Sequence, residues 1–183
     1  TYLGQNNASG YAAGLDVKLF GEMVPGVDSW LGFSLMRTME KIDGSNEYIP
    51  RPTDQLYNIS LFFQDYVPGL PQYRVHVLFN WAQGFPVCPP HSPRSASKNL
   101  RASDYRRVDI GVSRVFEKGK DPWMGRGFFK PFKQILIAFE VLNLFGFNNV
   151  NSYYWVTDIY NVQYAVPNYL TGRQFNLKIQ LKF

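Results

Sequence analysis

The sequence predicts an all-β fold: an antiparallel transmembrane β-barrel segment of about seven up-and-down strands, not closed by itself. Residues 173–183 alternate between polar and apolar side chains without exception, and the other predicted strands show the same period of two. Aromatic residues make up 17% of the chain, which is typical of strands that face lipid. The connections between the predicted strands alternate in length, as they do in up-and-down membrane barrels.

The strand at 173–183 has the clearest pattern. Its apolar face holds Phe175, Leu177, Ile179, Leu181 and Phe183, and its polar face holds Gln174, Asn176, Lys178, Gln180 and Lys182. About ten tilted residues cross a bilayer as a strand, with the apolar side to lipid and the polar side to a watery lumen. A soluble sheet with its apolar side on a core gives the same pattern, but the length and the aromatic last residue favour the membrane.

The earlier strands are justified by the same alternation. They are expected at residues 11–22, 29–41, 57–64, 73–82, 107–116 and 134–141. Pro25-Gly26 and Pro68-Gly69 carry the residues that tight turns prefer in their central positions. Arg37 falls on the apolar face of its strand; a position near lipid headgroups or a bulge would each explain it. Phe62 is an aromatic residue on a polar face.

Alternate connections in such a sheet lie at the same end. Long loops are expected at 42–55, 84–104 and 146–172, so they share one end, while the short turns and the C-terminus share the other. Bacterial outer-membrane barrels show this asymmetry, with long loops outside the cell. The longer connection at 117–132 is an exception at the short end. Because bacterial barrels have even strand counts, seven strands indicate a piece of a barrel.

The composition excludes several classes of protein. The longest apolar runs are far shorter than the roughly 18 residues that a membrane-spanning helix needs. The net charge of +5 is spread over strand ends, loops and polar faces, so no nucleic-acid partner is expected. One cysteine, Cys88, rules out an intrachain disulfide framework. The start of the chain has no signal-peptide pattern, and for an exported membrane protein we therefore expect that Thr1 is not the translated start.

Four stretches carry a resemblance to a known family. They read LNLFGFNN at 142–149, YRRVDIGV at 105–112, YAVPNYL at 164–170 and YLTGRQFNLKIQLKF at 169–183. Together they resemble the C-terminal part of the β-barrel of TonB-dependent outer-membrane receptors, in the versions common in Bacteroidetes, which include SusC-like nutrient importers. The resemblance covers most of the chain, and its specific part is the final 50 or so residues.

The resemblance implies a role for the whole chain. Residues 1–183 would form the last strands, 16 to 22, of a 22-stranded barrel, without the plug domain and the TonB box. The protein would lie in the bacterial outer membrane and contact its lipid, the rest of the barrel and plug, TonB through the plug, and a SusD-like surface lipoprotein. Its function would be TonB-coupled import of a nutrient such as a glycan, peptide or siderophore. Phe183 would be the aromatic end of the barrel-assembly signal.

No catalytic residue, metal or cofactor is expected. The two histidines, His76 and His91, have no spacing from a serine or an acid that supports a triad or a metal site. Polar residues of the strands are candidates for lining a solute path, although contact with a plug or with water is the favoured explanation for any single one of them. They are Asp16, Lys18, Arg74, His76, Asn80, Asp109, Glu140, Lys178 and Gln180.

The last long loop is the candidate for capture of a ligand or partner. It contains four large aromatic residues, Tyr153, Tyr154, Trp155 and Tyr160. Aromatic rings suit stacking on carbohydrates or other planar ligands, but contact with a lipoprotein or with one another is also consistent with the sequence. Two alternatives to transport stay open: a receptor-like barrel that acts as a scaffold in a larger outer-membrane complex, and a soluble β-sandwich that binds a ligand.

Overall fold

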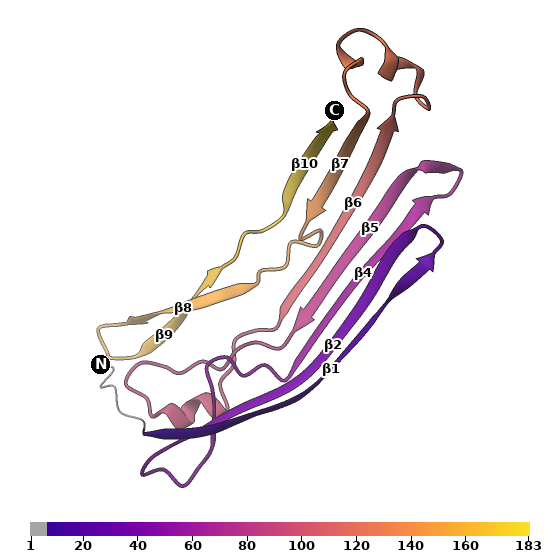
Figure 1. The fold of residues 1–183 in the computed structure, drawn as a ribbon. Coiled ribbons are helices and arrows are strands. Elements are labelled where there is room, and N and C mark those ends of the chain that lie inside the picture. The colour runs from indigo at the N-terminus through magenta and orange to yellow at the C-terminus, as the bar shows by residue number, and fades with distance from the viewer. Residues whose placement is uncertain (1–6) are drawn as a thin grey trace.

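A computed structural model describes residues 7–183, so the expectation about Thr1 lies outside the described residues (Figure 1). Seven strands form one antiparallel sheet, and their order across the sheet is their order in the chain. They are β1 (Ala8–Val24), β2 (Val27–Ile42), β4 (Tyr57–Val67), β5 (Leu70–Ala82), β6 (Tyr105–Glu117), β7 (Gln134–Leu142) and β10 (Gln174–Lys182). The all-β, antiparallel, up-and-down sheet predicted from the alternation is therefore confirmed.

Smaller elements fill the connections. A two-residue strand, β3 (Ile49–Pro50), pairs with β2, and β8 (Val150–Thr157) pairs with β9 (Gln163–Tyr169) as a separate hairpin. Short 3-10 helices occur at η1 (Arg94–Lys98), η2 (Pro122–Gly125) and η3 (Gly127–Phe129). In the part of the chain that the structure describes, no helix has the length and apolar character needed to cross a membrane. The sequence did not predict β3 or the β8–β9 hairpin.

The register between strands places the predicted apolar side chains on one face. One row across the sheet runs from Leu31 through Leu61 and Phe79 to Val108. A second row runs Val75, Val112, Phe139 and Leu177. Because side chains alternate along every strand, this alignment places mostly polar residues on the opposite face, where Trp30, Phe62 and Leu78 form an apolar row across β2, β4 and β5. These faces are called the apolar face and the polar face below.

The apolar face is not covered by another layer of the described chain. Leu15, Leu177 and Ile179 on this face are 59%, 63% and 59% exposed. The β8–β9 hairpin lies beyond the ends of β7 and β10 instead of over the face (Figure 1). The seven strands are thus a single layer, which differs from the two packed sheets of a sandwich. A contiguous apolar surface of this kind is characteristic of a contact with another protein or with lipid.

The two ends of the sheet differ as predicted. The turn end carries tight turns at Gly26 and Gly69, whose φ values of +83° and +76° favour glycine. The loop end carries the long connections 43–56, 83–104 and 143–173, as Figure 1 shows. Arg37 is near the loop end, where its Nη1 lies 4.0 Å from Asp54 Oδ2. The pairing of β1 with β2 is regular around Arg37, so no bulge re-aims it.

The sheet is open within the described residues. β1 and β10 are its outer strands, and each pairs with one neighbour only, β2 and β7 respectively. The free edge of β1 is 17 residues long and that of β10 is 9 residues long. Each edge presents backbone N–H and C=O groups without a strand partner, which water or further strands must satisfy.

Candidate functional site

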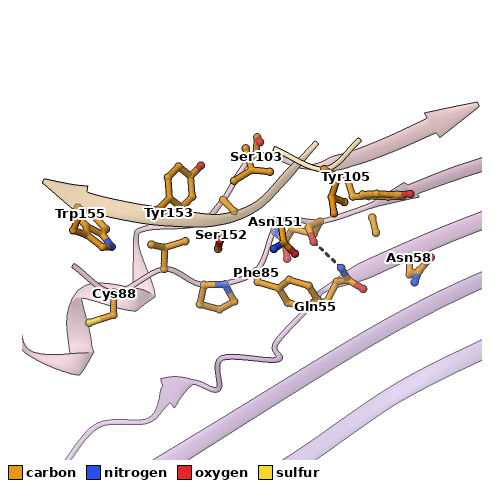
Figure 2. Close-up of a pocket in the computed structure, with 18 residues that line it drawn as sticks. Gln55, Asn58, Phe85, Cys88, Ser103, Tyr105, Asn151, Ser152, Tyr153 and Trp155 are labelled. Atoms are coloured by element: carbon orange, nitrogen blue, oxygen red, sulfur yellow. Dashed lines mark hydrogen bonds between the residues drawn. The ribbon is translucent and has the colours of Figure 1, made fainter. Parts of the chain in front are cut away.

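A pocket of about 530 Å³ lies at the loop end of the sheet, and we call it the loop-end pocket (Figure 2). The main sheet contributes the loop-end residues of β4, β5 and β6, and the rest of the wall comes from both ends of the 83–104 connection and from β8. Gln55, just before β4, and Leu170, just after β9, complete the lining. Asn58, Ala82 and Tyr105 are paired with one another across β4, β5 and β6 and contribute the floor. All three belong to the polar face, so the pocket opens on that side of the sheet.

The four aromatic residues predicted in the last long loop fall into two groups in the structure. Tyr153 and Trp155 line the pocket and are half-buried. Tyr154 and Tyr160 are 63% and 80% exposed and do not line it. Tyr154 is excluded because successive side chains of a strand point to opposite faces, and Tyr160 is excluded because it lies in the turn between β8 and β9. The sequence placed all four in one loop but did not show that only two of them share a cavity.

The lining of the loop-end pocket is uncharged. Its polar side chains are the amides of Gln55, Asn58, Gln83 and Asn151 and the hydroxyls of Ser103, Tyr105, Ser152 and Tyr153. Its aromatic side chains are Phe85, Tyr105, Tyr153 and Trp155. Aromatic surface with a few amide and hydroxyl groups suits a neutral ligand that carries its own hydroxyl or amide groups. A charged ligand would lose its hydration without gaining an opposite charge.

Two amides of the pocket are held in place by the backbone. Gln55 Nε2 donates a hydrogen bond of 2.8 Å to the Gln83 carbonyl oxygen, which Figure 2 marks. The Leu56 N–H donates to Gln83 Oε1 at 2.9 Å. These bonds fix side chains from two different connections against each other, so this wall is preorganised. Neither glutamine was singled out from the sequence, and no local pattern could have identified them.

Asp104 anchors the 83–104 connection to the sheet. Its carboxylate accepts hydrogen bonds from Tyr57 Oη at 2.6 Å, from Trp81 Nε1 at 3.3 Å and from the Gly84 N–H at 3.2 Å. Burial by itself would raise the pKa of this carboxyl, but these donors and the charge of Arg106 leave its pKa below the ordinary value. The ionised form of Asp104 therefore holds both ends of this connection next to the pocket.

Asp54 is a second anchor and is fully buried. It accepts a hydrogen bond of 2.7 Å from the Thr38 N–H and forms an ion pair with Arg101. Arg101 Nη1 also donates to the carbonyl oxygens of Asp54 and Gly84, at 3.0 and 3.1 Å. Burial would raise the pKa of Asp54, but the donors from Thr38 and Arg101, with the charge of Arg37, lower it below its ordinary value. The two long connections are thereby joined.

The stretch 142–149 positions the β8–β9 hairpin. Asn143 adopts a left-handed conformation with φ of 53°, its N–H donates to Asp109 Oδ1 at 2.7 Å, and its Oδ1 accepts from the Phe147 N–H at 3.0 Å. Asn149 pairs with the backbone of Arg106 through two hydrogen bonds of 2.8 Å. Asparagine tolerates the left-handed region and its amide imitates backbone pairing, which explains this residue type at both positions.

The candidates for a solute path do not form one cluster. Asp16, Lys18, Arg74 and Lys178 are exposed on the polar face, and Asn80 is half-buried there. Asp109 is buried, and Arg107 Nε lies 2.7 Å from its Oδ1, so its carboxylate supports the fold instead of facing solvent. Gln180, on β10, is exposed. Only His76 and Glu140 are brought together, with 3.6 Å between Nε2 and Oε1.

Other possible reactive groups stand alone. Among residues 7–183, no group of three or more His, Cys, Asp or Glu side chains has the geometry to hold a metal ion. His91 lies in the 83–104 connection, and Cys88 is an exposed free thiol that contributes to the pocket wall.

The terminal residue Phe183, predicted as the end of an assembly signal, packs against Phe132 with 4.9 Å between ring centroids.

Comparison of the chain with protein-family models, with curated proteins and with solved structures gave no match.

Proposed function

We propose that the chain is an arc of a β-barrel in the bacterial outer membrane, and that it is the C-terminal part of a TonB-dependent receptor that imports a nutrient. The observation that carries this proposal is the single-layered sheet with one uncovered apolar face and one polar face. In water, such a face would be unstable and prone to association. In a bilayer, lipid chains cover this face, so its apolar side chains are not exposed to water.

Strand length and the open edges support the same proposal. β10 has 9 residues, close to the roughly 9–11 that a tilted strand needs to cross a membrane. Unpaired backbone groups in hydrocarbon cost several kcal/mol each, so the free edges of β1 and β10 require more strands. Those strands, from the same or another chain, would close the cylinder, and the polar face would then line its interior.

The loop-end pocket supplies the step of ligand capture. In this proposal the loop end faces the outside of the cell, where long loops of outer-membrane barrels lie. The pocket opens toward the polar face, so a captured solute would enter on the lumen side. Its uncharged, aromatic lining favours a neutral solute such as an oligosaccharide. Tyr154 and Tyr160, which are exposed and do not line the pocket, remain available for a SusD-like lipoprotein.

TonB coupling belongs to the proposal through the family resemblance. A plug inside the barrel would contact polar-face side chains and would rearrange when TonB pulls on it, releasing the solute toward the periplasm. His76 and Glu140 lie on the face where such a plug would sit. The side chains of the chain itself bind and orient; none of them is proposed to break a covalent bond.

A scaffold in a larger outer-membrane complex is the second candidate. The observation that favours it is that most of the predicted solute-path residues lie apart from one another on the polar face. A scaffold needs the apolar face and the assembled strands but not the loop-end pocket. Loss of the pocket would therefore leave a scaffold working and stop an importer.

The experiment compares uptake in cells. A strain that carries the intact protein is given neutral oligosaccharides, and uptake is measured with and without a working TonB system. Replacing Trp155 with Ala should reduce uptake several-fold, whereas the matched change Tyr154→Ala, on the other face of β8, should not. If uptake survives both the loss of TonB and the change Trp155→Ala, this protein is not the importer, and the scaffold role remains as the candidate. A protein that is soluble and monomeric without detergent would refute both.

A further inference from the structure

We infer that residues 118–133, the connection between β6 and β7, form an interfacial anchor that binds anionic phospholipid headgroups. This connection, here called the turn-end segment, lies beside the C-terminus at the end of the sheet opposite the long loops (Figure 1). The inference rests on the proposed function, because it requires that the strands cross a membrane. It adds a binding surface that the transport mechanism does not use.

The turn-end segment is packed onto the sheet. Phe116 and Ile135 are paired on the apolar face at the ends of β6 and β7. Met124 and Phe132 pack with them and are 0% and 5% exposed. The N–H of Lys133 donates to the Lys182 carbonyl oxygen at 2.8 Å, which fixes the end of the segment to β10. The segment is therefore packed against the turn-end edge of the apolar face.

Large aromatic rings on this segment remain uncovered. Trp123 packs edge-on against Phe116, with 5.1 Å between centroids, and Phe129 packs against Trp123 at 4.8 Å. Phe128 follows at 5.6 Å from Phe129 and is 79% exposed. These rings continue the apolar face at its edge. Aromatic side chains at the edge of a lipid-facing surface sit at the level of the headgroups.

The same segment carries cations that no carboxylate neutralises. Lys120 pairs with Glu117 at 2.6 Å, and Asp121 pairs with Arg114 at 3.3 Å. The remaining cations are exposed, and no carboxylate within the described chain lies within 4.0 Å of them. They are Lys118, Arg126, Lys130 and Lys133. Four such cations beside exposed aromatic rings complement a surface that is both apolar and negatively charged.

The 83–104 connection at the loop end shows the opposite arrangement. Arg94, Lys98 and Arg101 in the 83–104 connection are each paired with a carboxylate of the chain, at Glu40, Glu47 and Asp54. Those cations hold loops together and are not available to a ligand. Of these two connections, only the turn-end segment combines cations free of carboxylates with exposed aromatic rings, so the attraction for anionic headgroups is expected at the turn end. In the proposed orientation, this is the inner, periplasmic leaflet, which consists of phospholipid.

The test is native mass spectrometry of the detergent-purified protein titrated with dioleoylphosphatidylglycerol or dioleoylphosphatidylcholine. We expect several-fold more retained phosphatidylglycerol than phosphatidylcholine. The double variant R126Q/K133Q should remove this preference, because neither side chain makes a hydrogen bond that holds the segment. The control K18Q/K178Q removes the same charge from the polar face and should keep the preference. Phe128→Ser should weaken retention of both lipids and leave the preference between them unchanged.

Three results would overturn the inference: equal retention of the two lipids, loss of the preference in the control but not in R126Q/K133Q, or full suppression by equimolar inorganic phosphate. The last result would mean that the segment binds free phosphate and not a lipid. K130Q, judged with the same lipids, repeats the test if R126Q/K133Q does not fold. A protein that needs no detergent would refute the proposed function and this inference together, whereas equal lipid retention by a detergent-dependent protein would refute the anchor alone.

Discussion

His76 on β5 lies 3.6 Å from Glu140 on β7, measured from Nε2 to Oε1, although β6 runs between their strands. Gly111 of β6 is the residue paired with both of them, and the missing side chain lets them meet over the backbone. Asn176 on β10 extends the contact, because its Nδ2 donates to Glu140 Oε2 at 2.8 Å. A row of polar side-chain contacts thus runs across β5, β6, β7 and β10 on the polar face.

Gly111→Ala should separate His76 from Glu140. A Cβ at this position would lie 2.7 Å from His76 Nε2 and 2.9 Å from Glu140 Cγ, so one side chain must move. We expect a loss of about 1–3 kcal/mol in the free energy of unfolding, as for other overpacked sites. Urea unfolding of the protein in detergent or lipid measures it. Gly21→Ala is the matched control, since a Cβ there meets nothing within 4 Å.

The double variant Gly111→Ala, His76→Ala should recover part of that loss, because the shortened side chain leaves room for the new methyl group. Non-additivity of this kind is expected for residues in direct contact. If the two single changes simply add, the crowding over Gly111 is not the cause of the instability.

The variant Leu177→Arg tests whether the apolar face of β10 contacts lipid or water. Leu177 is 63% exposed on the apolar face of β10, and a charge there would enter hydrocarbon if the strand crosses a membrane. The expected cost is about 2–4 kcal/mol near the bilayer centre. Gln180→Arg, on the polar face of the same strand, should change the free energy of folding by about 0.5 kcal/mol or less, as exposed surface substitutions do. Folding titrations in lipid vesicles give both values, and equal, small costs would contradict the membrane orientation.

Cys88 offers a direct probe of the loop-end pocket, because it is the chain's one cysteine and contributes to the pocket wall. A bulky maleimide on its exposed thiol should occupy part of the cavity of about 530 Å³. We expect labelling to block the binding of a neutral oligosaccharide and the bound sugar to slow labelling. Tryptophan fluorescence, with Trp155 in the wall, reports the binding, and Cys88→Ser is the control for the label. Independent labelling and binding would place the ligand elsewhere.

Stability should depend on pH through Asp54. The pKa of this carboxyl is lower in the folded chain than in the unfolded chain, so its contribution is complete above the unfolded pKa and is lost as pH falls through the folded value. Asp54→Asn should cost about 3–5 kcal/mol at pH 7, because Arg101 would lose its buried partner. The difference in unfolding free energy between wild type and variant should shrink below about pH 4. A difference that stays constant down to pH 3 would exclude this linkage.

Periodicity predicted the strands but not the contents of the long loops. Alternation over residues such as Phe175–Phe183 specifies both a strand and its apolar side, because the side-chain period of a strand is two. The β8–β9 hairpin escaped prediction, since residues 150–169 mix aromatic and polar side chains without a clear period. The sequence showed that aromatic residues gather there, but their division between the pocket and solvent depends on the hairpin.

The sequence by itself determined the class of fold, the strands of the main sheet and the face of each strand that is apolar. Those properties are local, because they depend on neighbours one and two positions away along the chain. The tertiary structure decided which distant residues meet: His76 with Glu140, Asp54 with Arg101, and Trp155 with the start of the 83–104 connection. Such contacts depend on strand register and on hydrogen bonds between loops, which link positions tens of residues apart and leave no periodic trace in the chain.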